Sequence, residues 1–497
     1  MLNRFGEIAG RETPFKVLIL VGNDLVGDSR VQKIIQASIA SGNKTFVVAR
    51  KSSSRQDPPG LELAKIIRIP LYPNSPNLHA GYSYQDRIIR FLQRNWINPR
   101  ANIIAFRYRI KYANRRNKMR VKRVIFKVVN SDSVLVPMKS YRQKLVAANR
   151  ERRETRLNQI ASGQVEVNIE TYLPREVVFP DFGKYLEKMH SWFVYPAIGV
   201  KPDLIHANDA DTLSIAIAVK DHWKLRGHNV AVVYDSHEFT SGVYRPNPTW
   251  LPAMESLEER YIPQVDAVAT VSDAIARLLK EKFELPKLPT VILNAPSTEV
   301  DAVQLPFPSL RASLKLDASI PLFVYVGVSA QMRGVHTVIE ALKFYPDAHL
   351  AVVTKLNNYV RSCVEMATDL GVEDRLHILP YVPAHLVSTY ISDATAGISP
   401  CLHHPNHELS CFTKFYEYLH AGLPIVTSDV QVMKETTLEY GVGTVFVAED
   451  ARDCATQMEK LASGIVNFKG AISQSLLDDW SWETQAEKLD ALYKSVL

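Results

Sequence analysis

Short apolar runs rich in β-branched residues alternate along this chain with amphipathic helical patterns. The first run, at 15–21, leads through a turn containing Gly27 to Asp28, which suits the cap of a helix. That helical pattern stops near Gly42, and a second apolar run follows at 45–49. A strand, a helix and a strand in this order form a right-handed unit, so we expect a parallel sheet. The pattern returns at 204–207, 230–234 and 267–271.

A second series of strands begins after the segment 296–321, which is rich in Pro, Ser and Ala and has no long periodic pattern. We place a domain boundary inside this segment, at residues 305 and 306. Six short apolar runs separated by helical patterns follow it, at 322–327, 350–354, 376–379, 396–400, 424–427 and 443–447. The chain therefore predicts an α/β protein with two doubly wound, Rossmann-like domains, 1–305 and 306–475. Ligands of such sheets bind where the strands end, which here is a cleft between the domains.

Residues 80–190 interrupt the first series, and we interpret them as an insertion in the first domain. Within it, 87–156 holds 21 Lys and Arg against three acidic residues, with aromatic residues between them. We expect a basic helical insertion that contacts anionic membrane lipids. The alternatives are contact with an anionic glycan, contact with a nucleic acid, and a solvated face without a dedicated partner. Of these, we do not expect nucleic acid.

The composition narrows the class of protein. A chain of 497 residues, of which 46% are hydrophobic, is long enough for two cores. It contains no apolar run of about 18 residues and no apolar stretch of signal-peptide type before residue 15, so we expect a cytoplasmic protein, peripheral on the inner face of the membrane. The four cysteines lack metal-ligand spacing and are expected to be buried free thiols: Cys363, Cys401, Cys411 and Cys454.

The segment 408–429 carries the most informative chemistry. Lys414 and Glu417 lie three residues apart, hence on one helix face, and Gly422 and Pro424 end that helix directly before an apolar strand. A carboxylate in this place can accept hydrogen bonds from a ribose diol. A lysine one turn earlier, near the positive end of the helix, can hold phosphates of the same nucleotide.

This segment resembles the nucleotide-sugar helix of family 4 of the retaining glycosyltransferases, which have the two-domain GT-B fold. Five residues match a variant of the family's motif: Lys414, Glu417, Tyr418, Gly422 and Pro424. The resemblance also covers 15–50 and 200–497, but not the basic insertion. It implies that residues 476–497 form a terminal helix that packs back toward the first domain.

The chain departs from the family's commoner motif at one position. That motif has a second Glu eight residues before the ribose-binding one, where this chain has Leu409. Glu408 lies one place too early. We therefore keep Glu408 and the backbone amides of Cys411 and Phe412 as candidates for this contact with the donor.

A second resemblance covers 325–342, where Arg333 and Gly334 open an amphipathic helix after a strand and a polar loop. The family usually has Arg or Lys at this position, which implies that Arg333 grips the diphosphate as the glycosidic bond breaks. A solvated arginine at a helix start is the alternative. Together with His237, described next, Arg333 and Lys414 are the candidate catalytic residues.

Three segments of the first domain also resemble the family, and each follows or ends a predicted strand. They are the opening helix around Arg30, the strand end at 203–209 and the strand end at 234–238. We expect His237 to contact the transferred sugar; a structural histidine within the loop is the alternative. The candidates for the acceptor side of the cleft are Gly27, Asp28, Arg30, Asn208, Asp209 and Glu238. Asp209 and Asp211 have the spacing of a metal-binding pair, but we interpret them as the start of a helix, with capping as the role.

The resemblance implies transfer of a sugar from a UDP- or GDP-linked donor to the hydroxyl of a glycan or lipid-linked acceptor, with retained configuration and no metal or other cofactor. A role in glycan, polysaccharide or glycolipid biosynthesis follows from it. One alternative is a sugar-nucleotide epimerase or a hydrolase on the same fold. Another is a non-catalytic binding subunit. No phosphate-binding loop of the GxxxxGK[ST] type and no HExxH motif occurs.

Overall fold

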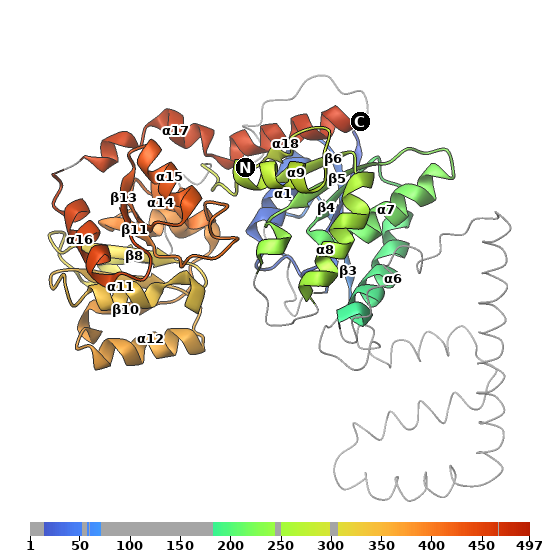
Figure 1. Cartoon of the computed structure of the whole chain (residues 1–497). Coiled ribbons are helices and arrows are strands. Elements are labelled where there is room, and N and C mark those ends of the chain that lie inside the picture. Colours follow the sequence, from blue (N-terminus) through green and yellow to red (C-terminus); the bar gives the residue numbers. More distant parts are fainter. Residues whose placement is uncertain are drawn as a thin grey trace, which may run out of the picture.

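The computed structural model contains two α/β domains (Figure 1). The chain leaves the first domain through the segment before residue 298, and the C-terminal helices lead back to the first domain. It describes residues 14–51, 57–58, 60–70, 182–243, 250–298, 307–465 and 467–497. The basic block at 87–156 and nearly all of the expected insertion at 80–190 lie outside the described residues. No described helix is long and apolar enough to span a membrane.

The first domain is built on a seven-stranded parallel sheet with the order β3-β2-β1-β4-β5-β6-β7. Its strands are β1 (Lys16–Leu20), β2 (Lys44–Arg50), β3 (Lys65–Ile69), β4 (Leu204–Asn208), β5 (Ala231–Ser236), β6 (Ala267–Thr270) and β7 (Thr290–Val291). The strand order reverses between β1 and β4, so the loops that follow these two strands diverge and leave a crevice there.

Helices cover both faces of this sheet. They are α1 (Ser29–Ala40), α6 (Phe182–Val200), α7 (Ala210–Lys224), α8 (Trp250–Tyr261) and α9 (Asp273–Lys282), with 3-10 turns η2 (Thr240–Gly242) and η3 (Ile262–Gln264). Leu18 and Leu20 pack in the core on the side of α6, α7 and α8, whereas Val17 and Ile19 pack on the side of α1. Because successive side chains of a strand alternate between faces, a strand buried on both faces reads as the continuous apolar run seen in the sequence.

The second domain has a six-stranded parallel sheet with the order β10-β9-β8-β11-β12-β13. Its strands are β8 (Leu322–Val326), β9 (His349–Val353), β10 (Leu376–Leu379), β11 (Ala396–Ser399), β12 (Ile425–Ser428) and β13 (Gly443–Phe446). Its helices are α10 (Leu310–Leu314), α11 (Val335–Ala341), α12 (Asn358–Asp369), α13 (Val387–Ile391), α14 (Thr413–His420), α15 (Gln431–Glu439) and α16 (Ala451–Ala462), with 3-10 turns η4 (Gln331–Arg333), η5 (Glu373–Arg375), η6 (Ala384–Leu386) and η7 (Phe468–Ala471).

Helix α17 (Gln474–Asp479) ends the second domain, and α18 (Trp482–Val496) lies across the first (Figure 1). Trp482, Leu489 and Tyr493 of α18 are buried in the same core cluster as the inner face of α1. Where the chain crosses back, the Trp482 amide donates to the carbonyl of Pro296 at 2.8 Å. The two chain segments that join the domains are therefore bonded to each other.

The predicted doubly wound architecture is confirmed, since every strand expected from an apolar run is present. Two strands were not predicted. β3, at the edge of its sheet, has Lys65 and Arg68 among its apolar residues, and β7 has only two residues, so neither forms a long apolar run. The four cysteines are free and buried, as expected.

Candidate active site

A cavity of about 600 Å³ lies between the domains, where strands of both sheets end. Its first-domain wall comes from the loop after β1, the starts of α1 and α7, the segment after β5, and α8. Its second-domain wall comes from the end of η4 and from the loop that leads into α14. The lining residues are Asn23, Asp24, Gly27, Asp28, Ser29, Arg30, Asp209, Ala210, Asp211, His237, Glu238, Thr240, Val243, Trp250, Met254, Val271, Asn294, Arg333, Asn406, Ser410, Cys411, Phe412 and Thr413.

Arg333 brings a positive charge to this cavity. Gly334 follows it in the left-handed conformation at φ 70°, and a side chain there would collide with the carbonyl of Pro400, so only glycine fits. The guanidinium lies over the ring of Phe412, with 4.1 Å between Cζ and the ring centroid. Its Nη1 atom is buried and has no hydrogen-bond partner in the described part of the protein. A guanidinium that lines the cavity with one buried, unused donor is suited to receive an anion.

The second-domain wall ends at the N-terminus of α14. Phe412 is the N-cap and makes no side-chain cap, so the first amides of the helix are not capped by this residue. Lys414 and Glu417 follow on the buried side of α14, just behind the lining residues, and their side chains are 8% and 7% exposed. The ammonium of Lys414 lies 3.6 Å from the ring centroid of Tyr325, at the end of β8.

Burial shifts the pKa values of these two residues in opposite directions. It lowers the pKa of Lys414 to about 7 and raises the pKa of Glu417 to about 7. The charges of Lys33, on α1 of the first domain, and of Lys414 act against the rise at Glu417. A nucleotide that brought its diphosphate and ribose diol to this helix would therefore meet polar groups that are already removed from water.

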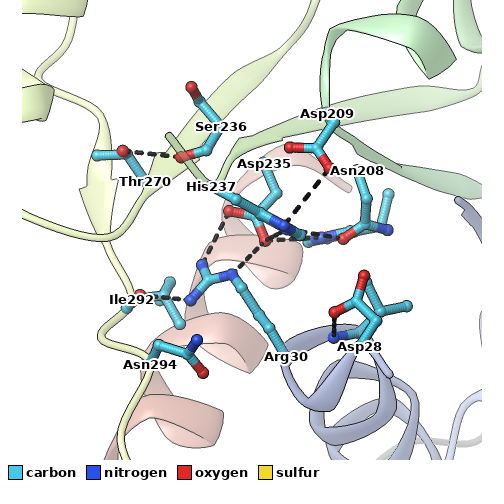
Figure 2. A network of polar contacts seen from close by, with 12 residues as sticks. Asp28, Arg30, Asn208, Asp209, Asp235, Ser236, His237, Thr270, Ile292 and Asn294 are labelled. Atoms are coloured by element: carbon cyan, nitrogen blue, oxygen red, sulfur yellow. Dashed lines mark hydrogen bonds and ion pairs between the residues drawn. The ribbon is translucent and has the colours of Figure 1, made fainter. Parts of the chain in front are cut away.

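On the first-domain wall, Asp235 at the end of β5 contacts three basic side chains, of which Arg30 and His237 are labelled in Figure 2. Arg30 of α1 donates to its carboxylate twice, from Nε at 3.0 Å and from Nη2 at 2.8 Å. His206 and His237 reach the Oδ2 atom of the same carboxylate at 3.3 and 3.1 Å. Burial alone would raise the pKa of Asp235, yet Arg30 and His237 hold it well below its usual range. Asp235 is thus a buried anion that orients the groups around it.

His237 is held by two acceptors on one side and faces the cavity. Its Nε2 lies 3.1 Å from Asp235 Oδ2 and 3.1 Å from Asn208 Oδ1, while Nδ1 lies 3.7 Å from Asp209 Oδ2 (Figure 2). Burial alone would lower the pKa of His237, but the carboxylates of Asp209 and Asp235 raise it to about 9. His237 is therefore a protonated donor in the wall of the cavity.

The C-terminal helix reaches this network. The hydroxyl of Tyr493 lies 3.0 Å from His206 Nδ1, and both side chains are buried. Because the Asp235 carboxylate can only accept, His206 donates from Nε2, and its Nδ1 accepts from Tyr493. The tautomer of His206 is fixed by a residue 287 positions away in the sequence.

Some of the other first-domain candidates only line the cavity, whereas others have side chains that bond to the protein itself. Gly27 and Glu238 line the cavity. Asp28 also lines it, but its carboxylate caps α1 by accepting from the Val31 amide at 3.1 Å. Asn208 is fully buried and donates to the Leu20 carbonyl at 2.9 Å, so it ties β4 to β1 behind the lining residues. Arg30 reaches the cavity but uses its guanidinium on Asp235 and on the carbonyl of Ile292.

The expected capping role of Asp209 is wrong. Asp209 occupies the N-cap position of α7, but its side chain makes no cap hydrogen bond, and its backbone has a φ of 60°. The carboxylate turns toward His237 instead. Within the described residues, no group of three His, Cys, Asp or Glu side chains is arranged to hold a metal ion.

Glu408 does not line the cavity. One carboxylate oxygen lies 2.7 Å from His403 Nδ1, and the other accepts from the Gln431 amide at 2.7 Å, at the start of α15. Leu409, which stands where the family has its Glu, packs against the first-domain core. Cys411 and Phe412 line the cavity.

Several residues of the site were missed in the sequence. Asp235 and His206 lie within the two strand-end motifs, so their positions in the sequence could have identified them. No sequence pattern points to Tyr493 or Asn406 as residues of the site. Both belong to segments that only the fold brings to the cleft. The same is true of Trp250, Met254 and Asn294.

Comparison with known structures supports the fold. Sucrose-phosphate synthase from Thermosynechococcus elongatus superimposes with a TM-score of 0.60 at 16% identity, over 97% of this chain and 98% of that chain. Anabaena HepE in complex with UDP and glucose gives 0.57 at 13% identity, over 97% and 100%. α,α-Trehalose 6-phosphate synthase from Burkholderia multivorans also gives 0.57 at 13%, over 97% of both chains. No curated protein sequence matches the chain.

Two Rossmann-like domains that face a cavity lined from both sides define a GT-B protein. The chain resembles family 4 of the glycosyltransferases: residues 145–300 match the family described as Glycosyltransferase Family 4, and residues 307–464 match Glycosyl transferases group 1. Each domain is thus a glycosyltransferase domain.

Proposed function

We propose that the protein transfers a sugar from a nucleotide-sugar donor to an acceptor hydroxyl with retention of anomeric configuration. The observation that carries this proposal is the buried, unpaired Nη1 of Arg333, which borders the cavity beside the N-terminus of α14. A leaving diphosphate carries the charge that such a site can stabilise. Lys414, behind the same helix start, adds a second cation.

The remaining parts of the donor follow from this placement. Glu417 binds the ribose diol, three residues further along α14 than Lys414, and the amides of Cys411 and Phe412 face the sugar end of the donor. His237 lies on the opposite wall of the cavity, where Asp235 holds it, and donates to the transferred sugar. The donor is a UDP or GDP sugar. The structurally similar Anabaena protein was solved in complex with UDP and glucose, which supports a nucleotide sugar as the donor. No metal is needed where cationic side chains balance the diphosphate.

In the proposed reaction the bond between the anomeric carbon and the diphosphate oxygen breaks, and its electron pair stays on the diphosphate. The acceptor oxygen bonds to the anomeric carbon from the same face, and its proton passes to the departing diphosphate. A strong protein base is not required. The protein positions the reactants, excludes water and stabilises the leaving group.

The acceptor enters along the first-domain wall, which carries Gly27, Asp28, Asp209 and Glu238. Carboxylates accept hydrogen bonds from sugar hydroxyls, so a glycan or lipid-linked glycan suits this wall. We place the enzyme in glycan, polysaccharide or glycolipid biosynthesis, in the cytoplasm and against the membrane through residues 87–156.

Substitution of Glu417 tests the donor site. Glu417→Ala removes a charged hydrogen-bond acceptor, so the affinity for UDP or GDP should fall by about 1.5–3 kcal/mol for each lost bond. Titration calorimetry measures it. The matched control is Glu365→Ala, which removes an exposed acid from α12 of the same domain and should bind as the wild type does. Equal affinity of a folded Glu417→Ala variant would refute the placement of the ribose.

The fate of the sugar separates transfer from the alternatives on the same fold. Incubation with UDP-glucose or GDP-mannose and no acceptor should release little free sugar and no epimer. Adding candidate glycans should then stimulate nucleotide release. Rapid formation of free sugar or epimer without acceptor identifies a hydrolase or an epimerase instead.

A further inference from the structure

The loop between β11 and α14 departs from the family pattern at Leu409. Glu408 is bound by His403 and by the start of α15, as described above. Leu409 packs on the first-domain core, and its carbonyl accepts from the Ser272 hydroxyl at 2.5 Å. This loop is therefore docked across the cleft, and neither residue offers a charged group to the cavity.

Asn406 is a second side chain of this loop that reaches from one domain to the other. The backbone amide of Phe239, two residues after His237, donates to Asn406 Oδ1 at 3.1 Å. Because an amide N–H can only donate, the atom that faces it is the oxygen of the side chain. The two N–H donors on Nδ2 consequently point the other way.

Those donors are available to a ligand. Asn406 is 9% exposed and lines the cavity, and Nδ2 has no hydrogen-bond acceptor among the residues that the structure describes. The backbone of Asn406 also packs closely on the first domain, since a Cβ at Gly242 would lie 3.1 Å from the Asn406 backbone nitrogen. The hydrogen bond from the Phe239 amide holds the orientation of the side chain.

We propose that Asn406 recognises the transferred sugar: its Nδ2 donates hydrogen bonds to an oxygen of that sugar. Asn406 would thereby take the place of the carboxylate that the family has at the position of Leu409. This inference rests on the proposed donor site. His237 and Arg333 line the same cavity and are also donors, so the sugar meets hydrogen-bond donors from both domains. Asn406 is bonded to Phe239, two residues from His237, only when the domains are docked as here.

The test separates recognition from docking. Asn406→Asp keeps an acceptor for the Phe239 amide but replaces the N–H donors with an oxygen. Asn406→Ala removes both without adding charge. Ser272→Ala is the control: it removes the hydrogen bond to the Leu409 carbonyl, together with the N-cap of α9, and leaves Asn406 in place. Calorimetry then gives the Kd of UDP and UDP-glucose, or of GDP and GDP-mannose, for each variant below its melting temperature.

The ratio of the Kd of the nucleotide sugar to that of the nucleotide is the decisive quantity, because any effect on the shared nucleotide cancels. It should rise about tenfold in Asn406→Asp and about three- to tenfold in Asn406→Ala, and stay unchanged in Ser272→Ala. An unchanged ratio in both folded Asn406 variants overturns the inference alone. Failure of the wild type to bind any nucleotide overturns the proposed function instead.

Discussion

Arg30 and Asp235 form a two-point ion pair in which their side chains are only 3% and 1% exposed. The pair joins the first turn of α1 to the end of β5, and the Asp235 carboxylate then aligns His237 (Figure 2). A charge buried this deeply is stable only while its partner is present.

Arg30→Met should therefore destabilise the protein by about 3–5 kcal/mol, because it leaves the Asp235 charge buried and less compensated. Equilibrium denaturation measures the loss. The comparison is Lys220→Met, which breaks the more exposed pair with Asp266 and should cost less than about 1 kcal/mol. Similar losses in the two variants would contradict the role given to Arg30.

His237 should titrate near pH 9, well above the usual value of about 6.5. Because its pKa is raised in the folded state, its protonation contributes stability that is fully present below pH 6.5 and is lost as the pH rises through 9. Histidine ring signals in NMR spectra report the titration. The stability difference between wild type and His237→Gln should shrink from pH 6 to pH 9.5, and a constant difference would show that His237 is neutral.

Transfer activity should persist in EDTA, because Arg333, Lys414 and the amides at the start of α14 are proposed to balance the diphosphate. The measurement is nucleotide release from the donor with and without chelator. Complete loss on chelation, restored by magnesium or manganese, would reject the proposed charge balance.

The basic block at 87–156 should attract the protein to anionic lipid, at about 1 kcal/mol for each basic residue near the surface. Co-sedimentation with anionic vesicles should be strong at low salt and weak at high salt, and zwitterionic vesicles should not bind. Binding that ignores lipid charge, or no binding at low salt, would count against membrane contact and leave the transferase proposal intact.

Much of the fold could be predicted because its strands are buried on both faces and read as apolar runs. β3 could not, since Lys65 and Arg68 interrupt its apolar residues at the sheet edge. Part of the candidate site could also be predicted from the sequence. Lys414 and Glu417 are three residues apart on one helix, so local geometry alone places them together.

The sequence by itself determined the two parallel sheets, the helix α14 and the strand ends that carry His237 and Asp235, because these depend on the periodicity and spacing of neighbouring residues. Only the tertiary structure decided which side chains are free to bind. Folding of the second domain turned Glu408 toward α15, and docking of the domains brought Asn406 to Phe239. Packing of α18 brought Tyr493 to His206. Contacts between residues more than 150 positions apart leave no local pattern in a sequence, because burial and the geometry of the folded chain create them.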